Sequence, residues 1–312
     1  MSARKGQIVS AVIEVQNLHK KYGDLVAVDD VSFSVEEGEI FGILGPSGAG
    51  KTTTVECIEG LRNRDGGEIN VLGLDPRQER AEITQQLGVQ LQDGQLPDRM
   101  QVAEALSLYS SFYRNPADWR HLMDALGLSS KGGNACGALS GSQKQRLSVA
   151  LALVGNPQVA VLDELTTELD PQSRRETWEL IKTVRDSGVT ILLVTRFVEE
   201  AELLCDRIAV IDKGRIAATD TPAGLAERVQ TEQRIQFRPS APLNDALLAR
   251  LPDVSGVTRQ GDYVVVTGNH NALGAVTCLL AHHQIVAEHL RVDQATLEDV
   301  LLTMAHKRSA TL

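Results

Sequence analysis

Cysteine, aromatic residues and positive charge are all scarce in this sequence. Only 4% of its 312 residues are aromatic, and its four cysteines form no C-x-x-C pair, so neither a zinc site nor a disulfide framework is expected. The formal net charge is −10, which argues against a broad nucleic-acid-binding surface because phosphate contacts require clustered lysines and arginines. We therefore expect reduced thiols and no nucleic-acid partner.

Long apolar runs are also missing. No run approaches the roughly 20 residues that a helix needs to cross a bilayer, and the apolar stretch at residues 8–13 is too short for the core of a secretory signal. If the protein works at a membrane, we expect another chain to span it. The length and the 42% hydrophobic content are instead typical of a globular chain with two domains.

A phosphate-binding loop of the pattern G-x-x-x-x-G-K-[ST] is present at residues 45–53. Its residues are Gly45, Pro46, Ser47, Gly48, Ala49, Gly50, Lys51, Thr52 and Thr53. An apolar stretch at 39–44 precedes the loop and helical spacing follows it at 53–61, which is the strand, loop and helix order that the motif requires. A glycine-rich turn that matches by chance is the alternative, and it does not explain these flanks.

Each residue type in this loop has a physical reason to be there. Glycines let backbone N–H groups approach phosphate oxygens, and the start of the following helix adds a partial positive charge. Lys51 is expected to reach the β- and γ-phosphates of a nucleotide, and the hydroxyl of Thr52 is expected to bind magnesium. The loop alone does not separate kinases, GTPases and motor ATPases.

An acidic pair follows the apolar run at residues 159–162. A continuous run of this kind is typical of a central parallel strand that is buried on both faces. Asp163 and Glu164 come at its C-terminal end, which is where open α/β sheets bind ligands. We predict that Asp163 belongs to the magnesium shell and that Glu164 polarises the water that attacks the γ-phosphate. A solvated strand end is the alternative.

The surrounding sequence alternates between strand and helix patterns, which indicates a doubly wound α/β sheet. Polar and apolar residues alternate at 13–18 and 28–35, as in half-exposed antiparallel strands. Further strands are expected at 66–73, 87–92, 189–194 and 208–212, the last of which is expected to close the sheet. Helices are expected within 98–128 and 139–151 and at 171–186.

Two features of this region are open to two interpretations each. Tyr22 could stack on an adenine ring or be an ordinary surface-loop tyrosine. The helical pattern at 98–128 holds much of the aromatic content and could form either a small helical core or a docking face for a partner.

After residue 229 a second pattern begins. Strands are expected at 234–238, 263–267 and 285–292, and helices at 243–251, 272–282 and 296–305. This mixture predicts a small α+β domain at residues 230–306.

Taken together, these stretches resemble the nucleotide-binding domain of ATP-binding cassette (ABC) proteins over residues 11–225, in the family's order and spacing. Residues 161–164 match the Walker B motif of that family. The resemblance makes Tyr22 the adenine-stacking aromatic residue and Gln92 the glutamine that links magnesium to the helical subdomain. Asp170 matches the loop that reaches across the dimer. The LSGGQ-like signature, which caps the γ-phosphate of the opposite subunit, contains Ser140, Gly141, Ser142 and Gln143.

The resemblance implies an α/β fold: a P-loop NTPase (RecA-like) core with an antiparallel β-subdomain and a helical subdomain at about residues 93–150. It also implies that two such domains meet head to tail, sandwich two ATP molecules with Mg²⁺, and separate after hydrolysis. Because this sequence has one phosphate loop, the second nucleotide-binding domain is expected from another chain, in a homodimer or a heterodimer.

Four residues depart from the family pattern. Ser142 replaces a glycine, Leu165 a proline, Glu168 a small residue and Arg196 the switch histidine. Ser142 could crowd a backbone N–H that must approach phosphate. Arg196 could contact the γ-phosphate, could pair with Glu164 and hold this base away from water, or could pair with Glu168. We expect ATP binding to be retained and hydrolysis, for which Glu164 and Arg196 are the candidate residues, to be weakened or to depend on a partner.

The segment 295–302 is similar to the C-terminal stretch of drug-resistance ATPases of the daunorubicin-exporter (ABC-2) type. An amphipathic terminal helix capped by Thr296 is the alternative. The resemblance implies the ATP-binding and ATP-hydrolysing subunit of an exporter, held at the cytoplasmic side of the cell membrane by a separate transmembrane (permease) subunit. A soluble regulatory ATP-binding module that is not coupled to transport is the second hypothesis.

Overall fold

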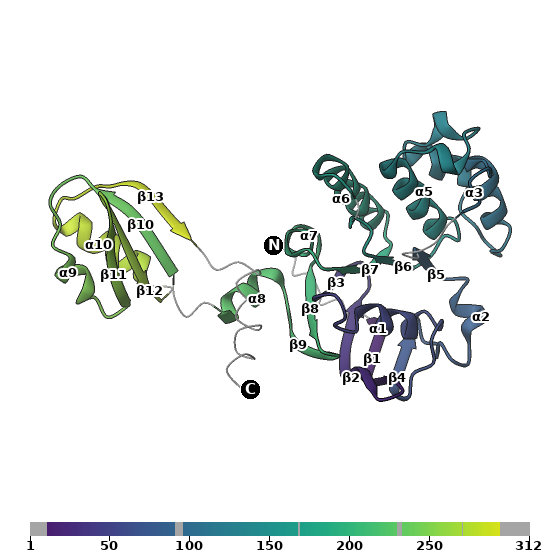
Figure 1. The fold of residues 1–312 in the computed structure, drawn as a ribbon, viewed down its shortest axis with the longest axis horizontal. Helices are drawn as coiled ribbons and strands as arrows, with labels where there is room; N and C mark the ends of the chain where they lie inside the picture. The colour runs from purple at the N-terminus through teal and green to yellow at the C-terminus, as the bar shows by residue number, and fades with distance from the viewer. Residues whose placement is uncertain (1–10, 91–95, 168, 230–232, 270, 294–312) are drawn as a thin grey trace, which may run out of the picture. The chain divides into compact units, whose positions relative to one another are not determined.

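The computed structural model describes residues 11–90, 96–167, 169–229, 233–269 and 271–293 (Figure 1). The chain divides into two compact units, Met1–Pro222 and Ala223–Leu312. No helix in the described ranges is long and apolar enough to cross a membrane.

The first unit contains a six-stranded sheet of order β5-β6-β7-β3-β8-β9 (Figure 1). Its strands are β3 (Ile40–Leu44), β5 (Leu87–Gln90), β6 (Val159–Asp163), β7 (Thr190–Thr195), β8 (Arg207–Asp212) and β9 (Arg215–Asp220). Strands β5, β6, β7, β3 and β8 run parallel to one another, and β3, β6 and β7 are buried along their whole length. Continuous apolar runs are expected for strands covered on both faces.

The sheet does not end where the sequence pattern indicated. We expected residues 208–212 to close it, but β9 pairs antiparallel with β8 and forms the edge. The two strands are joined by Lys213 and Gly214, which both have positive φ (47° and 76°). This is the backbone conformation that tight two-residue hairpins require.

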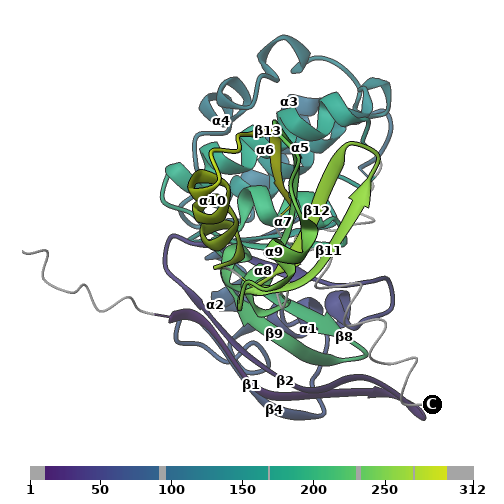
Figure 2. The same ribbon diagram turned by 90° about the vertical axis from the view of Figure 1, so that its left-hand side faces the viewer.

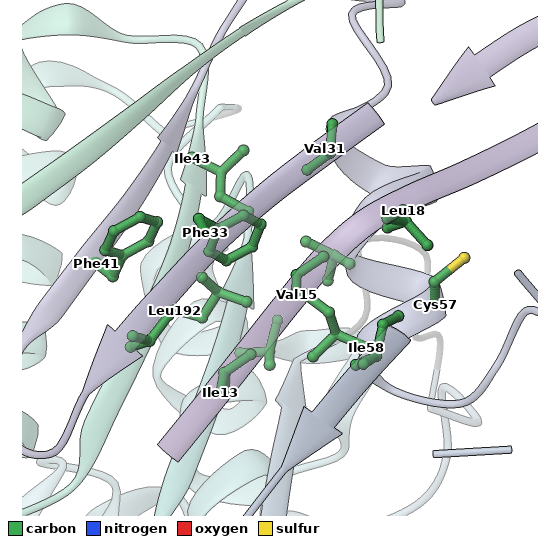
Figure 3. Close-up of a cluster of buried hydrophobic side chains, with 14 of the residues drawn as sticks. Ile13, Val15, Leu18, Val31, Phe33, Phe41, Ile43, Cys57, Ile58 and Leu192 are labelled. Carbon is green, nitrogen blue, oxygen red and sulfur yellow. The ribbon is translucent and has the colours of Figure 1, made fainter. Parts of the chain in front are cut away.

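A three-stranded antiparallel sheet of order β2-β1-β4 lies beside the parallel one. Its strands are β1 (Ala11–Tyr22), β2 (Leu25–Glu36) and β4 (Gly66–Val71). Tyr22 is the last residue of β1 and pairs with Leu25, so the strands are longer than their alternation indicated. Figure 3 shows how side chains of the two sheets meet; Phe33 stacks on Phe41 with 5.2 Å between ring centroids. One core therefore fixes the antiparallel sheet against the strand before the phosphate loop.

Helices complete the first unit. They are α1 (Lys51–Ile58), α2 (Arg80–Ile83), α3 (Val102–Ser110), α4 (Trp119–Ala125), α5 (Gly141–Leu153), α6 (Pro171–Asp186) and α7 (Val198–Leu204), with 3₁₀ turns at Ser129–Lys131 and Cys136–Ala138. Helices α3, α4 and α5 share a separate hydrophobic core that includes Leu106, Leu128 and Leu147. The helical pattern at 98–128 therefore does form a small core, while Phe112 at its edge is 62% exposed.

The second unit is a four-stranded antiparallel sheet of order β11-β12-β10-β13 with helices. Its elements are α8 (Pro222–Val229), β10 (Gln233–Pro239), α9 (Asp245–Ala249), β11 (Val254–Gln260), β12 (Tyr263–Gly268), α10 (Ala272–His282) and β13 (Ala287–Asp293). Figure 2 shows β11 and β12 as a hairpin. The sequence pattern missed β11, and the helix expected at 296–305 lies outside the described residues.

Candidate nucleotide-binding and catalytic site

Three glycines let the chain form the loop between β3 and α1. A Cβ on Gly45 would lie 2.2 Å from the carbonyl oxygen of Ile211, and one on Gly50 would lie 2.4 Å from that of Ala27. Gly50 and Gly48 also have positive φ (99° and 77°), which side chains other than glycine rarely adopt. Nothing lies within 4 Å of the Cβ position of Gly48. The loop is thus fixed by backbone packing on one side and open on the other, as a phosphate cradle must be.

The remaining loop residues also lie either on the packed side of the loop or on its open side. Pro46 and Ser47 are exposed with Gly48 at the tip, whereas Ala49 is buried in the core. Thr52 and Thr53 lie in the first turn of α1, and the side chain of Thr52 is exposed.

Lys51 is 4% exposed and is held by three oxygen atoms. Its Nζ donates to the carbonyl oxygens of Gly45 (3.0 Å) and Pro46 (3.2 Å) and lies 3.4 Å from Oε1 of Glu164. A buried ammonium group needs such partners because leaving it unpaired is costly. Since lysine has three N–H donors, a phosphate group that binds this lysine must exchange with one of these contacts.

Asp163 ends β6 next to α1. The hydroxyl of Thr52 donates a hydrogen bond to Oδ2 of Asp163 (3.3 Å). The backbone N–H of Asp163 donates to Oε1 of Gln90 (3.1 Å). Its Oδ1 is buried and has no hydrogen-bond partner among the described residues. Burial, and then the neighbouring charge of Glu164, raise the pKa of Asp163 to about 6.

A divalent cation fits this arrangement. Buried carboxylate oxygens without partners are rare and costly, and a carboxylate with a hydroxyl is a ligand set that magnesium uses. Thr52 and Asp163 therefore provide one suitable oxygen pair. Gln92, the third predicted ligand, lies outside the described residues.

Glu164 has an unusual backbone conformation. Its φ is 46°, a left-handed value that costs a residue with a side chain roughly 1–2 kcal/mol. Its N–H donates to the carbonyl oxygen of Val194 in β7 (2.9 Å), and the hydroxyl of Thr167 lies 3.4 Å from its Oε2. Strain of this kind persists only where neighbouring contacts hold it and is often found at functional sites.

The signature-like residues form the N-terminus of α5. Ser140 is the N-cap: its Oγ accepts from the N–H of Gln143 (3.3 Å), and Oε1 of Gln143 accepts from the N–H of Ser140 (3.1 Å). This reciprocal capping box stabilises the helix start. The hydroxyls of Ser142 and Ser140 lie 3.2 Å apart, and Ser140 and Gly141 are exposed. Their predicted role toward a second subunit stays a prediction.

Asp170 caps α6 in the same way. Its Oδ1 accepts from the N–H groups of Gln172 and Ser173 (3.0 and 3.1 Å). The hydrogen bonds from the hydroxyl and then the N–H of Ser173 lower the pKa of Asp170, which is exposed. Glu168, the departure in this loop, lies outside the described residues.

The ring of Tyr22 is flanked by two cations. Its side chain is 38% exposed, with Cζ of Arg62 at 5.0 Å and Nζ of Lys20 at 5.7 Å from the ring centroid. Cation–π contacts of this kind hold a ring in place at the surface. Partial exposure is compatible with stacking on a base.

The segment after β7 places Arg196 on an aromatic ring. Cζ of Arg196 lies 5.2 Å from the ring centroid of Phe197, and Cζ of Arg174 in α6 lies 4.4 Å from the same centroid. Within the described part of the chain, Glu164 forms its ion pair with Lys51 and not with Arg196. The sequence reasoning did not single out Phe197 or Arg174, although the aromatic residue directly after the switch position was a visible signal.

Comparisons with known proteins agree with this geometry. The ABC transporter family model matches residues 28–167. The Nod factor export ATP-binding protein I of Burkholderia orbicola is 43% identical over 223 residues, which are 70% of this chain and 73% of that protein. The daunorubicin resistance ATP-binding protein of Streptomyces coeruleorubidus is 32% identical over 308 residues, 95% of this chain and 96% of that protein.

Two further similarities concern most of the chain and the fold. The linearmycin resistance ATP-binding protein of Bacillus subtilis is 32% identical over 307 residues, 94% of this chain and 98% of that protein. The solved structure of a subunit of an ABC transporter complex from Clostridium perfringens is 26% identical, with a TM-score of 0.63, and covers 69% of this chain and 90% of that one.

The fold and the site define a P-loop NTPase, which confirms the predicted fold class. The chain belongs to the ABC transporter family, as one of its ATP-binding proteins, and is an ATPase of that type. The resemblance to drug-resistance ATPases is also confirmed. Proteins of this class bind ATP, dimerise and work with a transmembrane component.

Proposed function

We propose that this chain is the ATPase subunit that drives efflux through a separate transmembrane subunit, at the cytoplasmic side of the cell membrane. The observation that carries the proposal is the similarity over 95% of the chain to a daunorubicin resistance ATP-binding protein, together with the phosphate loop beside an acidic strand end. A second nucleotide-binding domain completes the site, either from another copy of this chain or from a different one.

We propose a different function for each of the two parts of the chain. Residues 11–225 are the nucleotide-binding domain, with a helical subdomain at about 93–150, and residues 230–306 are an accessory α+β domain. The exposed Phe112 (62%) and Leu108 (42%) at the edge of the helical core support a role of this subdomain as the docking face for the transmembrane partner.

The described residues support ATP hydrolysis as follows. Lys51 holds phosphate oxygens over the loop, and Tyr22 stacks on the adenine. Thr52 and Asp163 would hold Mg²⁺ together with Gln92, which lies outside the described residues, and the bound cation would shield the phosphate charge. Glu164 orients the attacking water and accepts its proton.

We propose further that hydrolysis is weak in the isolated chain or depends on a partner. The guanidinium group of arginine is permanently charged, and that of Arg196 lies over Phe197, whereas Glu164 forms an ion pair with Lys51. A permanently charged group cannot exchange protons with water and phosphate as an imidazole can. ATP binding does not need this residue and is retained.

The test is affinity purification of the tagged full-length chain from detergent-extracted membranes of its own host, followed by magnesium-dependent ATPase assays. Co-purification of a polytopic membrane protein, with turnover higher in that complex than in the isolated chain, is the expected result. A stable soluble assembly without any membrane protein would instead support the regulatory ATP-binding module. Fast turnover by the isolated chain would overturn the proposal of weak hydrolysis.

A further inference from the structure

The strained turn that carries Glu164 is anchored from three sides. Glu164 itself donates its N–H to Val194 of β7. The next residue, Leu165, accepts a hydrogen bond at its carbonyl oxygen from the side-chain amide of Gln145 in α5. The residue after that, Thr166, donates its hydroxyl to Oε1 of Glu200 in α7 at 2.8 Å. These anchors tie the turn to three different elements.

Glu200 is the only one of these anchors that brings a carboxyl group into the core. Its side chain is 0% exposed, and the same Oε1 accepts from Nε1 of Trp178 in α6 (2.9 Å). Its Oε2 has no hydrogen-bond partner within the described residues. Thr166 (0%) and Trp178 (4%) are buried with it.

A buried carboxyl group lowers the stability of the fold if it only fills space in the core. Burying a carboxylate without a counter-ion costs several kcal/mol, and well-packed apolar side chains are often at least as stable. Buried polar groups do, however, hold their partners in one arrangement, because any displacement leaves a donor or acceptor unpaired. Glu200 therefore specifies where Thr166 lies, and Thr166 is two residues from Glu164.

We infer that Glu200 is a positioning residue for hydrolysis: acting through Thr166, it holds the catalytic turn in register with α6 and with the segment that carries Arg196. Helix α7 begins at Val198, two residues after Arg196, and α6 begins directly after its cap Asp170. The carboxyl group thus joins the turn that carries Glu164 to α6 and to the segment that carries Arg196. The inference rests on the proposed role of Glu164 in hydrolysis.

Three conservative variants of the full-length chain separate positioning from folding. Thr166→Val removes the hydroxyl donor at nearly constant volume, and Trp178→Phe removes the other donor to the same oxygen. Glu200→Gln keeps an acceptor oxygen. Glu199→Gln is the matched control, because Glu199 is the preceding residue of α7 and is exposed.

Single-turnover hydrolysis, with the chain in excess over Mg-ATP, is the first measurement. We expect Thr166→Val to lower the rate constant at least tenfold while ATP affinity changes less than twofold. Glu200→Gln should lower it less, and the Thr166→Val/Glu200→Gln double variant should match Thr166→Val alone, because the two residues act through one contact. Trp178→Phe, which removes the contact of Glu200 with α6, should lower the rate constant less than Thr166→Val does, and Glu199→Gln should stay within threefold of the unmodified chain. Multiplying effects in the double variant, or an unchanged rate in Thr166→Val, would overturn the inference.

A spectroscopic measurement tests Glu200 even where turnover is slow. The chain has two tryptophans, Trp119 and Trp178, so the indole N–H resonance of Trp178 can be followed with Trp119 as internal reference. We expect Mg-ADP to shift the Trp178 resonance in the unmodified chain and to leave it unshifted in Thr166→Val. If Mg-ADP does not shift the Trp178 resonance in the unmodified chain, the inference is contradicted. Absence of turnover in the complex with its membrane partner would instead contradict the proposed function.

Discussion

Nζ of Lys51 lies 3.4 Å from Oε1 of Glu164, and both side chains are largely buried (4% and 12% exposed). The lysine is the first residue of α1, after the loop that follows β3, and the glutamate directly follows β6. In the sheet, β7 lies between β3 and β6. A γ-phosphate that binds Lys51 competes with this carboxylate for the same ammonium group. We therefore expect nucleotide binding to change the position of the Glu164 carboxylate, the proposed general base.

Replacing Glu164 with glutamine tests this coupling and the catalytic role together. We expect Glu164→Gln to lower turnover at least 100-fold, within the usual range for loss of a general base. ATP affinity should stay the same or rise up to severalfold, because Lys51 loses its ionic partner. Phosphate release and titration with a fluorescent nucleotide measure the two quantities, with Glu199→Gln as the control. A Glu164→Gln variant as active as the unmodified chain would exclude Glu164 as the base.

Arg196→His tests the departure at the switch position. We expect about tenfold faster turnover in the isolated chain, because the imidazole can exchange protons near neutral pH and the guanidinium cannot. ATP affinity should change little. Arg175→His, at an exposed position of α6, is the control for a general effect of charge. Slower turnover in Arg196→His would mean that the arginine itself contributes to catalysis.

Tyr22 is predicted to bind ATP through its ring and not through its hydroxyl. Stacking of a base on an aromatic side chain is worth roughly 1–3 kcal/mol. We therefore expect Tyr22→Ala to weaken ATP binding about tenfold and Tyr22→Phe to leave it within twofold. Equal affinities for all three chains, measured by calorimetry, would show that Tyr22 is only a surface residue.

Glu59 predicts a pH dependence of stability. Burial, and then the charges of Asp163 and Glu56, raise the pKa of Glu59 from 4.5 to about 8. Below pH 4.5 the carboxyl group is protonated in both the folded and the unfolded chain. Between pH 4.5 and 8 the folded chain retains a proton that the unfolded chain has released, so the free energy of unfolding falls as the pH rises through this window.

The Glu59→Gln variant removes this titration. We expect it to be more stable than the unmodified chain by a few kcal/mol at pH 8, on the order expected for such a pKa shift, and equally stable near pH 4. Urea unfolding from pH 4 to 8 measures the difference, and Glu68→Gln, at an exposed site, is the control. A stability difference that does not change with pH would contradict the prediction.

The helices and strands that were predicted well are those specified by residues within or next to the element itself. Helix α6 begins at Pro171 and ends at Asp186 as expected, because Asp170 caps it and proline favours the first helical position. The continuous apolar run of β6 likewise identified a buried parallel strand. Strands β9 and β11 were missed because both are largely exposed or half-buried and neither carries a continuous apolar run.

Some features of the site could likewise be predicted from the sequence, and others could not. The glycines that permit the phosphate loop and the acidic pair after β6 were visible in the sequence, because spacing along the chain defines them. Ser140 and Asp170 were singled out by resemblance to the family, and their role as helix caps was found in the structure. The contacts of Lys51 with Glu164, of Arg196 with Phe197 and of Glu200 with Thr166 were not visible in the sequence. Two of these three join segments far apart in the chain. Whether a carboxyl group is buried, and which donor it meets, depends on how those segments pack, and that information emerges only when the sheets and helices are brought together.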